Sequence, residues 1–246
     1  MTAVRRVVPP TPGDKPPIIL VHGAANSAVI WTYWQQELAS HGYASYAIDL
    51  RGHGESKPID LSDTSMHDYA DDVRSCAAEL GTKPVIMGWS MGGLVAMMAA
   101  ATGHAAACIG LAPSTPALEL DASVKIRSGE FGPEEYGITS DDPEHQRAMP
   151  DLDLEERKIA LASLGRESRR ARDQRKAGIV IEALPRPLLI VTGGSDRQWP
   201  RSQYDSLWLD ADFHEVPGAS HWGLVLNRRA IAATLPVVSD WLAEKA

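Results

Sequence analysis

Short apolar runs alternate along the chain with longer segments whose apolar residues recur at helical spacing. The apolar runs contain β-branched residues, which is typical of strands buried on both faces of a parallel sheet. The longer segments predict amphipathic helices that pack on such a sheet. We therefore expect an α/β fold, with a mostly parallel central sheet flanked by helices. The predicted strands are residues 4–8, 18–21, 43–48, 85–87, 106–111, 187–192 and 213–216, and the main predicted helices are residues 28–40, 66–80, 94–100 and 228–244.

The alternation of strand and helix stops after Pro113 and resumes at Pro187. An excursion of this length at the carboxyl end of a strand indicates a lid over a site rather than a plain loop. We therefore expect one α/β core domain made of residues 1–113 and 186–246. A helical cap, residues 114–185, is inserted into it and is called the inserted segment below.

Charge is divided unevenly within the inserted segment. Its first half is acidic and its second half is rich in arginine, and residues 154–164 and 167–177 are predicted to be helical. Opposite charges on neighbouring helices favour a solvated helical pair. The alternative is that the arginines bind an acidic substrate or an acidic carrier protein.

The overall composition narrows the classes of partner. A net charge of −8 over 246 residues argues against nucleic-acid binding, which usually requires a basic surface. Cys76 and Cys108 lack metal-ligand spacing and are predicted to be buried thiols. No long apolar core follows Arg5 and Arg6, so we recognise no signal peptide and expect a cytoplasmic protein without a membrane partner.

The candidate chemistry centres on the sequence Gly88-Trp89-Ser90-Met91-Gly92-Gly93, between a predicted strand and a predicted helix. The chain must turn sharply there, and glycines on either side of Ser90 leave room for a strained turn. The serine hydroxyl would stand at the end of the strand, beside helix N–H groups that can stabilise an oxyanion. This is the GxSxG nucleophile-elbow pattern in its expected context. The alternative is a chance turn of small residues, but the flanking strand and helix favour the nucleophile elbow.

Two more polar residues follow predicted strands. Asp196 comes after the strand at 187–192, and His221 comes after the strand at 213–216. Because the carboxyl ends of parallel strands meet at one edge of a sheet, we expect both residues to lie close to Ser90. Histidine can take the serine proton during attack, and aspartate can hold the histidine in the required tautomer. The sequence therefore predicts a catalytic triad of Ser90, Asp196 and His221.

The loop after the strand at 18–21 begins with His22-Gly23 and continues with small residues that allow a ligand to approach the backbone closely. We predict that the N–H groups of Ala24 and Met91 form an oxyanion hole. His22 suggests a catalytic base, but we favour a structural role for it. Similarly, we expect the charged turn 49–56 to fix a loop rather than to react.

Four residues near the triad are candidates for substrate binding. Trp89 and Trp222 flank the serine and the histidine, and either could line an apolar pocket or pack beneath a loop. Ala25 and Asn26 are small enough to leave room beside the nucleophile. We therefore predict a substrate site that includes all four.

These motifs together resemble those of the α/β-hydrolase superfamily, over nearly the whole chain. The resemblance rests on the His22-Gly23 loop, the 49–56 turn, the serine elbow and the triad order Ser, Asp, His. It implies a serine hydrolase that needs no cofactor. Haloalkane dehalogenases and epoxide hydrolases of this fold have Asp at the nucleophile position, so Ser90 argues against those activities.

The function expected from this resemblance is that of a carboxylesterase, which cleaves a small-molecule carboxylic ester through an acyl-enzyme on Ser90. A lactonase, a thioesterase, a carbon–carbon bond hydrolase or a carrier-protein ester esterase would use the same triad. The elbow also resembles that of pimeloyl carrier-protein methyl ester esterases. A non-catalytic ligand receptor on the same fold is the alternative from another class. No metal is implied, and we expect a monomer or a homodimer.

Overall fold

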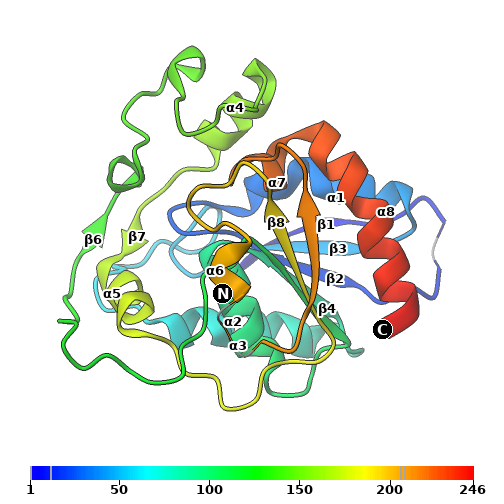
Figure 1. Cartoon of the computed structure of the whole chain (residues 1–246), viewed down its shortest axis with the longest axis horizontal. Helices are drawn as coiled ribbons and strands as arrows, with labels where there is room; N and C mark the ends of the chain where they lie inside the picture. Colours follow the sequence, from blue (N-terminus) through cyan, green and yellow to red (C-terminus); the bar gives the residue numbers. More distant parts are fainter. Residues whose placement is uncertain (1, 12, 206, 208) are drawn as a thin grey trace.

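The computed structural model describes residues 2–11, 13–205, 207 and 209–246. In this part of the chain a main sheet has seven strands, in the order β1-β3-β2-β4-β5-β8-β9 (Figure 1). β1 is antiparallel to β3, and the other neighbouring strands are parallel. The predicted mostly parallel sheet is confirmed. Its strands are β1 (Ala3–Val7), β2 (Ile18–Val21), β3 (Ser45–Asp49), β4 (Val85–Trp89), β5 (Ala107–Leu111), β8 (Leu188–Gly193) and β9 (Asp212–Val216).

Helices cover both faces of this sheet, as Figure 1 shows. Successive residues of a strand point to opposite faces, so Ile18 and Leu20 of β2 pack on one side and Ile19 and Val21 on the other. The first side carries α1, α7 and α8, and the second carries α2 and α3. The predicted helix at 28–40 begins as a 3-10 turn over Ala28–Trp31. The helices are α1 (Thr32–Ser40), α2 (Met66–Glu79), α3 (Met91–Ala100), α4 (Leu154–Ala162), α5 (Arg169–Ala177), α6 (Ser202–Asp205), α7 (Gly223–Leu226) and α8 (Arg228–Lys245).

The strand order reverses beside β2, and this brings together the loops that follow β2 and β4. The chain passes from β2 to β3 on one side, whereas β4 pairs with β2 on the other. Val21 lies opposite Gly88 in the β2–β4 register, so the loops that follow these strands start side by side. Open α/β sheets bind their ligands at such a reversal point. The fold therefore places the His22-Gly23 loop next to the serine elbow.

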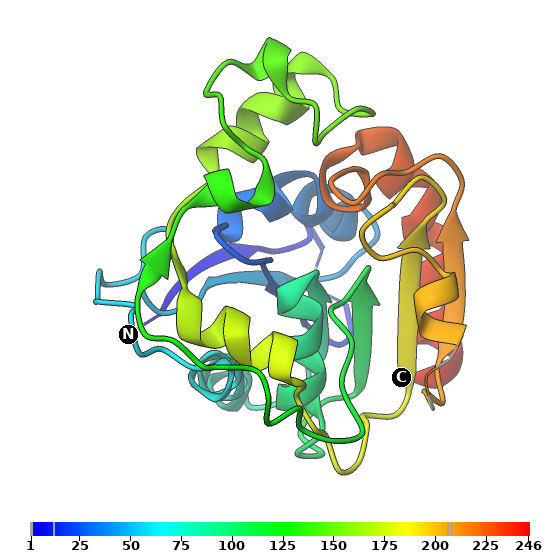
Figure 2. The same ribbon diagram turned by 60° about the vertical axis from the view of Figure 1, so that its left-hand side comes forward.

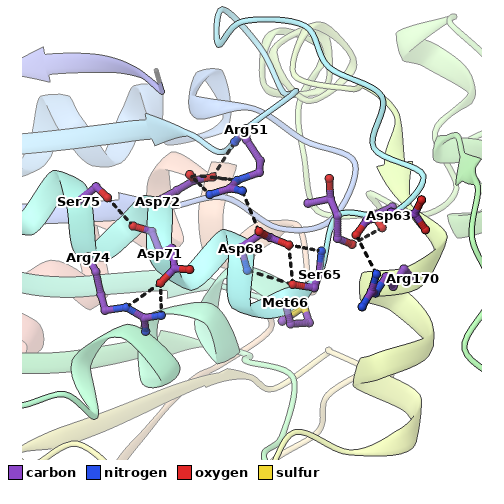
Figure 3. Close-up of polar contacts among 12 residues, drawn as sticks. Arg51, Asp63, Ser65, Met66, Asp68, Asp71, Asp72, Arg74, Ser75 and Arg170 are labelled. Carbon is purple, nitrogen blue, oxygen red and sulfur yellow. Dashed lines mark hydrogen bonds and ion pairs between the residues drawn. The ribbon is translucent and has the colours of Figure 1, made fainter.

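The turn after β3 is fixed to α2 by a charged network (Figure 3). Arg51 donates to both oxygens of Asp72 and, at 2.8 Å, to Oδ1 of Asp68. Asp68 also accepts from the backbone N–H of Ser65 at 2.9 Å, while the Ser65 hydroxyl accepts from the N–H of Asp68, forming a capping box at the start of α2. Asp49 accepts backbone N–H groups on both of its oxygens. These contacts support the structural interpretation of the turn.

The inserted segment contains α4, α5 and a short antiparallel pair, β6 (Glu130–Phe131) with β7 (Glu167–Ser168). Figures 1 and 2 show it beside the sheet, with α4 beyond the ends to which the β8 and β9 arrows point. Its acidic and basic halves bind each other: Glu135 pairs with Arg169 and Arg172, and Glu130 with Arg166. Three of the arginines in the basic half are thereby paired with acidic residues of the first half.

One helix boundary in this segment differs from the prediction of a helix over 167–177. Glu167 and Ser168 belong to β7, and α5 begins at Arg169. The Ser168 hydroxyl accepts from the N–H of Ala171 and so caps α5. The pairing with β6 therefore takes two residues that helical periodicity alone would add to α5.

Cys76 and Cys108 are free and buried, as predicted. Among the described helices, none is both long and apolar enough to cross a lipid bilayer.

Candidate active site

Ser90 occupies a strained turn between β4 and α3. Its backbone angles are φ 56° and ψ −121°, a combination that costs energy for any residue with a Cβ. The N–H of Ser90 donates to the carbonyl of Leu111 at 3.0 Å, and its own carbonyl accepts from Ser114 at 2.9 Å. The neighbouring strand β5 and the chain that follows it therefore hold this turn from both sides.

Small residues permit this close packing. A Cβ added to Gly88 would lie 2.1 Å from the carbonyl oxygen of Gly92. A Cβ added to Gly92 would lie 2.3 Å from the carbonyl oxygens of Val21 and His22. Both clashes involve backbone atoms, so β2, β4 and α3 could accommodate a side chain only by moving apart.

We expect Gly88→Ala to lower the free energy of unfolding by about 1–3 kcal/mol, because the added methyl group forces β4 away from α3. Chemical denaturation would measure this change. Gly13→Ala is a suitable control, since a Cβ at Gly13 meets no atom within 4 Å. Equal stability of the Gly88 variant and the native protein would show that the turn is not close-packed.

Asp196 and His221 form a hydrogen-bonded pair. Nδ1 of His221 donates to Oδ2 of Asp196 at 2.8 Å, and Oδ1 of Asp196 accepts from the backbone N–H groups of Gln198 and Trp199. Burial alone would raise the pKa of Asp196, but the hydrogen bond and charge of His221, with the two backbone donors, lower that pKa below its ordinary value. Asp196 is therefore anionic near neutral pH, and it leaves Nε2 of His221 as the free ring nitrogen.

One cavity brings the predicted site residues together. It has a volume of about 770 Å³ and lies between the sheet edge and the inserted segment. Among the described residues, Ser90 and His221 make no hydrogen bond with each other, although both line this cavity. Catalytic hydrogen bonds often form fully only when substrate binds. The predicted residues that line the cavity are Ala24, Ala25, Asn26, Trp89, Ser90, Asp196, His221 and Trp222.

Trp89 and Trp222 both pack and line the cavity. Trp89 donates its indole N–H to the carbonyl of His221 at 3.0 Å. The ring centroid of Trp89 lies 5.0 Å from that of His221 and 5.0 Å from that of Trp222. The two alternatives for these tryptophans are therefore not exclusive, because the same rings support the histidine loop and face the cavity.

The two backbone N–H groups predicted for an oxyanion hole lie just beyond the ends of the paired strands β2 and β4. Met91 is the first residue of α3, so its N–H has no acceptor within the helix. Ala24 follows β2 and lines the cavity beside Ser90, whereas Met91 is fully buried and is not among the lining residues. The next residue, Ala25, has a positive φ of 56°, and its N–H donates to Oε2 of Glu167 at 3.1 Å.

Within the described part of the chain, no group of three or more His, Cys, Asp and Glu side chains could hold a metal ion.

A family model described as the alpha/beta hydrolase family matches residues 18–234. The chain belongs to the α/β hydrolase family.

Individual relatives of this α/β hydrolase match over shorter stretches. A pimeloyl-[acyl-carrier protein] methyl ester esterase of Aliivibrio fischeri is 30% identical over 92 residues, which is 37% of this chain and 34% of that esterase. Protein phosphatase methylesterase 1 of Mus musculus is 35% identical over 103 residues, or 40% of this chain and 27% of that protein. These matches therefore span about a third or less of the relatives' length. A solved structure of polyneuridine aldehyde esterase superimposes with a TM-score of 0.71 at 18% identity, covering 92% of this chain and 100% of that one.

His22 has a structural role in this α/β hydrolase. Its Nδ1 donates to the carbonyl of Gly23 at 2.8 Å, and its Nε2 accepts from the N–H of Leu50 at 3.2 Å. Burial, together with the charge of His53, lowers the pKa of His22 to about 4. The ring is therefore neutral at pH 7 and links the loops that follow β2 and β3.

A fully buried carboxylate, Glu167, was missed by the sequence interpretation. Its Oε1 accepts from the hydroxyl of Tyr69 at 2.6 Å, and its Oε2 accepts from the N–H of Ala25. Oε2 also lies 3.5 Å from Nε2 of His53, a separation that makes the pair a Coulombic contact rather than a short hydrogen bond. Glu167 thus connects the inserted segment to the loop that carries Ala24.

The surroundings of His53 and Glu167 favour the charged form of each. Nδ1 of His53 donates to the carbonyl of Arg51 at 3.0 Å, and Nε2 faces Glu167, so both ring nitrogens face acceptors. Burial alone would lower the pKa of His53, but the nearby carboxylate raises it above its ordinary value. Burial alone would raise the pKa of Glu167, yet His53 and Tyr69 lower it to about 2.

A second carboxylate of the inserted segment reaches the loop that bears His221. Asp151 accepts from the backbone N–H of Ser220 at 2.8 Å and also binds its hydroxyl. Ser220 directly precedes His221. No local pattern distinguishes Asp151 or Glu167 from the solvated acidic residues around them, so neither could be found from the sequence.

Proposed function

We propose that this α/β hydrolase cleaves carboxylic esters through an acyl-enzyme on Ser90. The observation that carries the proposal is that Ser90, on its strained turn, lines the same cavity as His221, which is oriented by Asp196. A serine hydroxyl needs a base to react at neutral pH, and a histidine held by a carboxylate supplies one.

In the proposed reaction, Nε2 of His221 takes the hydroxyl proton while Oγ of Ser90 attacks the ester carbonyl carbon. The carbonyl oxygen becomes an oxyanion that accepts hydrogen bonds from the N–H groups of Ala24 and Met91. The intermediate then expels the alcohol, which takes the proton from His221. Water, deprotonated by the same histidine, attacks the acyl group, and His221 returns this proton to Oγ of Ser90 as the acid is released.

We further propose that the inserted segment, residues 114–185, acts as a cap on a core made of residues 1–113 and 186–246. Supporting this, the cavity takes lining residues from both parts, among them Ser90 from the core and Tyr136 and Leu164 from the segment. Such a cap shapes the substrate pocket and limits its contact with water.

The name of the Aliivibrio relative suggests a carrier-protein ester as one possible substrate. The structure gives less support to a carrier bound by the basic half of the inserted segment, because Arg169 and Arg172 are paired with Glu135. A small-molecule ester in the cavity is the better-supported substrate class.

The native protein should hydrolyse p-nitrophenyl esters, with turnover falling once the acyl chain outgrows the cavity. A fluorophosphonate probe should add to Ser90 alone, as seen by intact mass and peptide mapping. Turnover without an adduct at Ser90 would refute the serine mechanism. Binding of esters with neither turnover nor an adduct would favour a receptor.

A further inference from the structure

Three arginines line the cavity beside Ser90. The acidic residue among the described lining residues is Asp196, and its carboxylate is bound to His221 and two backbone N–H groups. The cavity therefore carries an excess of positive charge that no acidic lining residue balances. The three are Arg147, Arg175 and Arg197.

Arg175 on α5 is the half-buried member of this set. Its Nη2 donates to the hydroxyl of Tyr136 at 3.0 Å, and its Nη1 lies 3.5 Å from Oγ of Ser114. Both partners are neutral. Nε of Arg175 is buried and has no hydrogen-bond acceptor among the described residues. The guanidinium is thus held in place while its charge and one N–H group stay unmatched.

Other arginines of the same helix are used differently. Arg169 and Arg172 form ion pairs with Glu135 at the surface of the inserted segment. Arg175 forms no ion pair within the described structure. The charge of Arg175 does act on Glu167, but the oxygens of Glu167 already accept hydrogen bonds from other groups. No carboxylate of the described chain therefore binds Arg175 directly.

The position of Arg175 relates it to the reacting atoms. Ser114, which it contacts, donates its backbone N–H to the carbonyl of Ser90 at 2.9 Å. A group bound by Arg175 would therefore sit next to the serine turn, inside the same cavity. Guanidinium donors match the geometry of a carboxylate, which can accept two parallel hydrogen bonds from them.

We propose that the substrate is an ester that also carries a carboxylate, and that Arg175 binds this carboxylate while Ser90 attacks the ester carbonyl. The inference rests on the proposed ester hydrolysis and specifies its substrate class. Arg147 and Arg197 add to the positive field at the cavity mouth, since both are exposed. An uncharged ester of the same length would leave the charge of Arg175 without a counter-ion in the cavity.

The test compares mono-4-nitrophenyl adipate with 4-nitrophenyl hexanoate, which have acyl chains of equal length with and without a carboxylate. The native enzyme should show the higher kcat/KM for the adipate ester. Arg175→Gln should lower kcat/KM for adipate by about 10- to 100-fold, because a charge-assisted hydrogen bond is lost. The hexanoate value should fall by a smaller factor, since that ester has no carboxylate for Arg175 to bind, so the loss of the preference for adipate is the readout.

A second pair, 4-acetoxybenzoate and 4-acetoxybenzamide, places the charge on the alcohol side of the ester. The proposal is supported if the native enzyme prefers the charged member of either pair and Arg175→Gln loses that preference. The pair that shows the effect tells whether the carboxylate lies on the acyl side or the alcohol side of the ester. Lys176→Gln is the matched control, because Lys176 is the exposed neighbour on α5 and does not line the cavity. It should keep the native preference.

Arg175→Lys retains the charge and should keep part of the preference, which provides a second variant if Arg175→Gln does not fold. If the native enzyme cleaves the neutral member of both pairs as well as the charged one, the inference is wrong while ester hydrolysis stands. If no ester is cleaved and Ser90 is not labelled, the proposed function itself fails.

Discussion

Replacing Ser90 with alanine is expected to lower kcat for ester hydrolysis by about 10⁴- to 10⁶-fold, the range found when a catalytic serine is removed. Without Oγ, no acyl-enzyme can form, and His221 has no hydroxyl to activate. The proposed oxyanion donors and the cavity would remain, so binding of a substrate or inhibitor should change little. Steady-state kinetics of the variant, with inhibitor binding measured in parallel, would separate the two effects.

The matched control for this variant is Ser75→Ala on α2. Ser75 is exposed, but its hydroxyl only donates to the carbonyl of Asp71, so the control should retain full turnover and fluorophosphonate labelling. Retention of more than a tenth of native kcat in Ser90→Ala would place the nucleophile elsewhere.

The sequence predicted the sheet well because its strands carry continuous apolar runs. Ile18–Val21 is buried along its whole length, and so is Val85–Trp89, so neither run could be mistaken for an exposed segment. The ends of β4, β8 and β9 then indicated that Ser90, Asp196 and His221 lie near one edge of the sheet. Strand boundaries shifted by only one or two residues, since hydrogen bonding can extend slightly beyond an apolar run.

The polar contacts between distant segments could not be predicted in this way. Glu167, Asp151 and Arg175 lie in a charged stretch whose pattern is that of a solvated surface. Their positions depend on how the inserted segment folds back on the core, and one sequence contains no periodic signal for that. Glu167 was instead assigned to a helix, because its neighbours favour one.

Replacing Glu167 with glutamine is expected to lower the free energy of unfolding by about 3–5 kcal/mol at pH 5.5, the cost of leaving one member of a buried ion pair without its partner. The amide can still accept from the N–H of Ala25, but it cannot balance the charge of His53. Chemical denaturation at several pH values would measure the loss. Glu135→Gln is the matched control, because Glu135 also forms ion pairs, with Arg169 and Arg172, but is partly exposed, so a much smaller loss is expected.

The expected loss depends on pH, and its sign follows from the two pKa shifts. The raised pKa of His53 contributes stability that is fully present below its ordinary value of 6.5 and is lost as the pH rises through the raised value. The lowered pKa of Glu167 contributes stability that is present above 4.5 and is lost as the pH falls towards about 2. Both groups therefore make their full contribution to the free energy of unfolding between pH 5 and 6.5.

In Glu167→Gln, burial would keep His53 neutral in the folded state, whereas the unfolded chain would still bind a proton below about pH 6.5. The variant should therefore lose stability as the pH falls from 8.5 to 5.5, over the range in which the native pair is strongest. The difference between the two proteins should be largest at pH 5.5 and clearly smaller at pH 8.5. A difference that stays constant over this range would mean that His53 is uncharged in the native protein, and that Glu167 acts only through its hydrogen bonds to Ala25 and Tyr69.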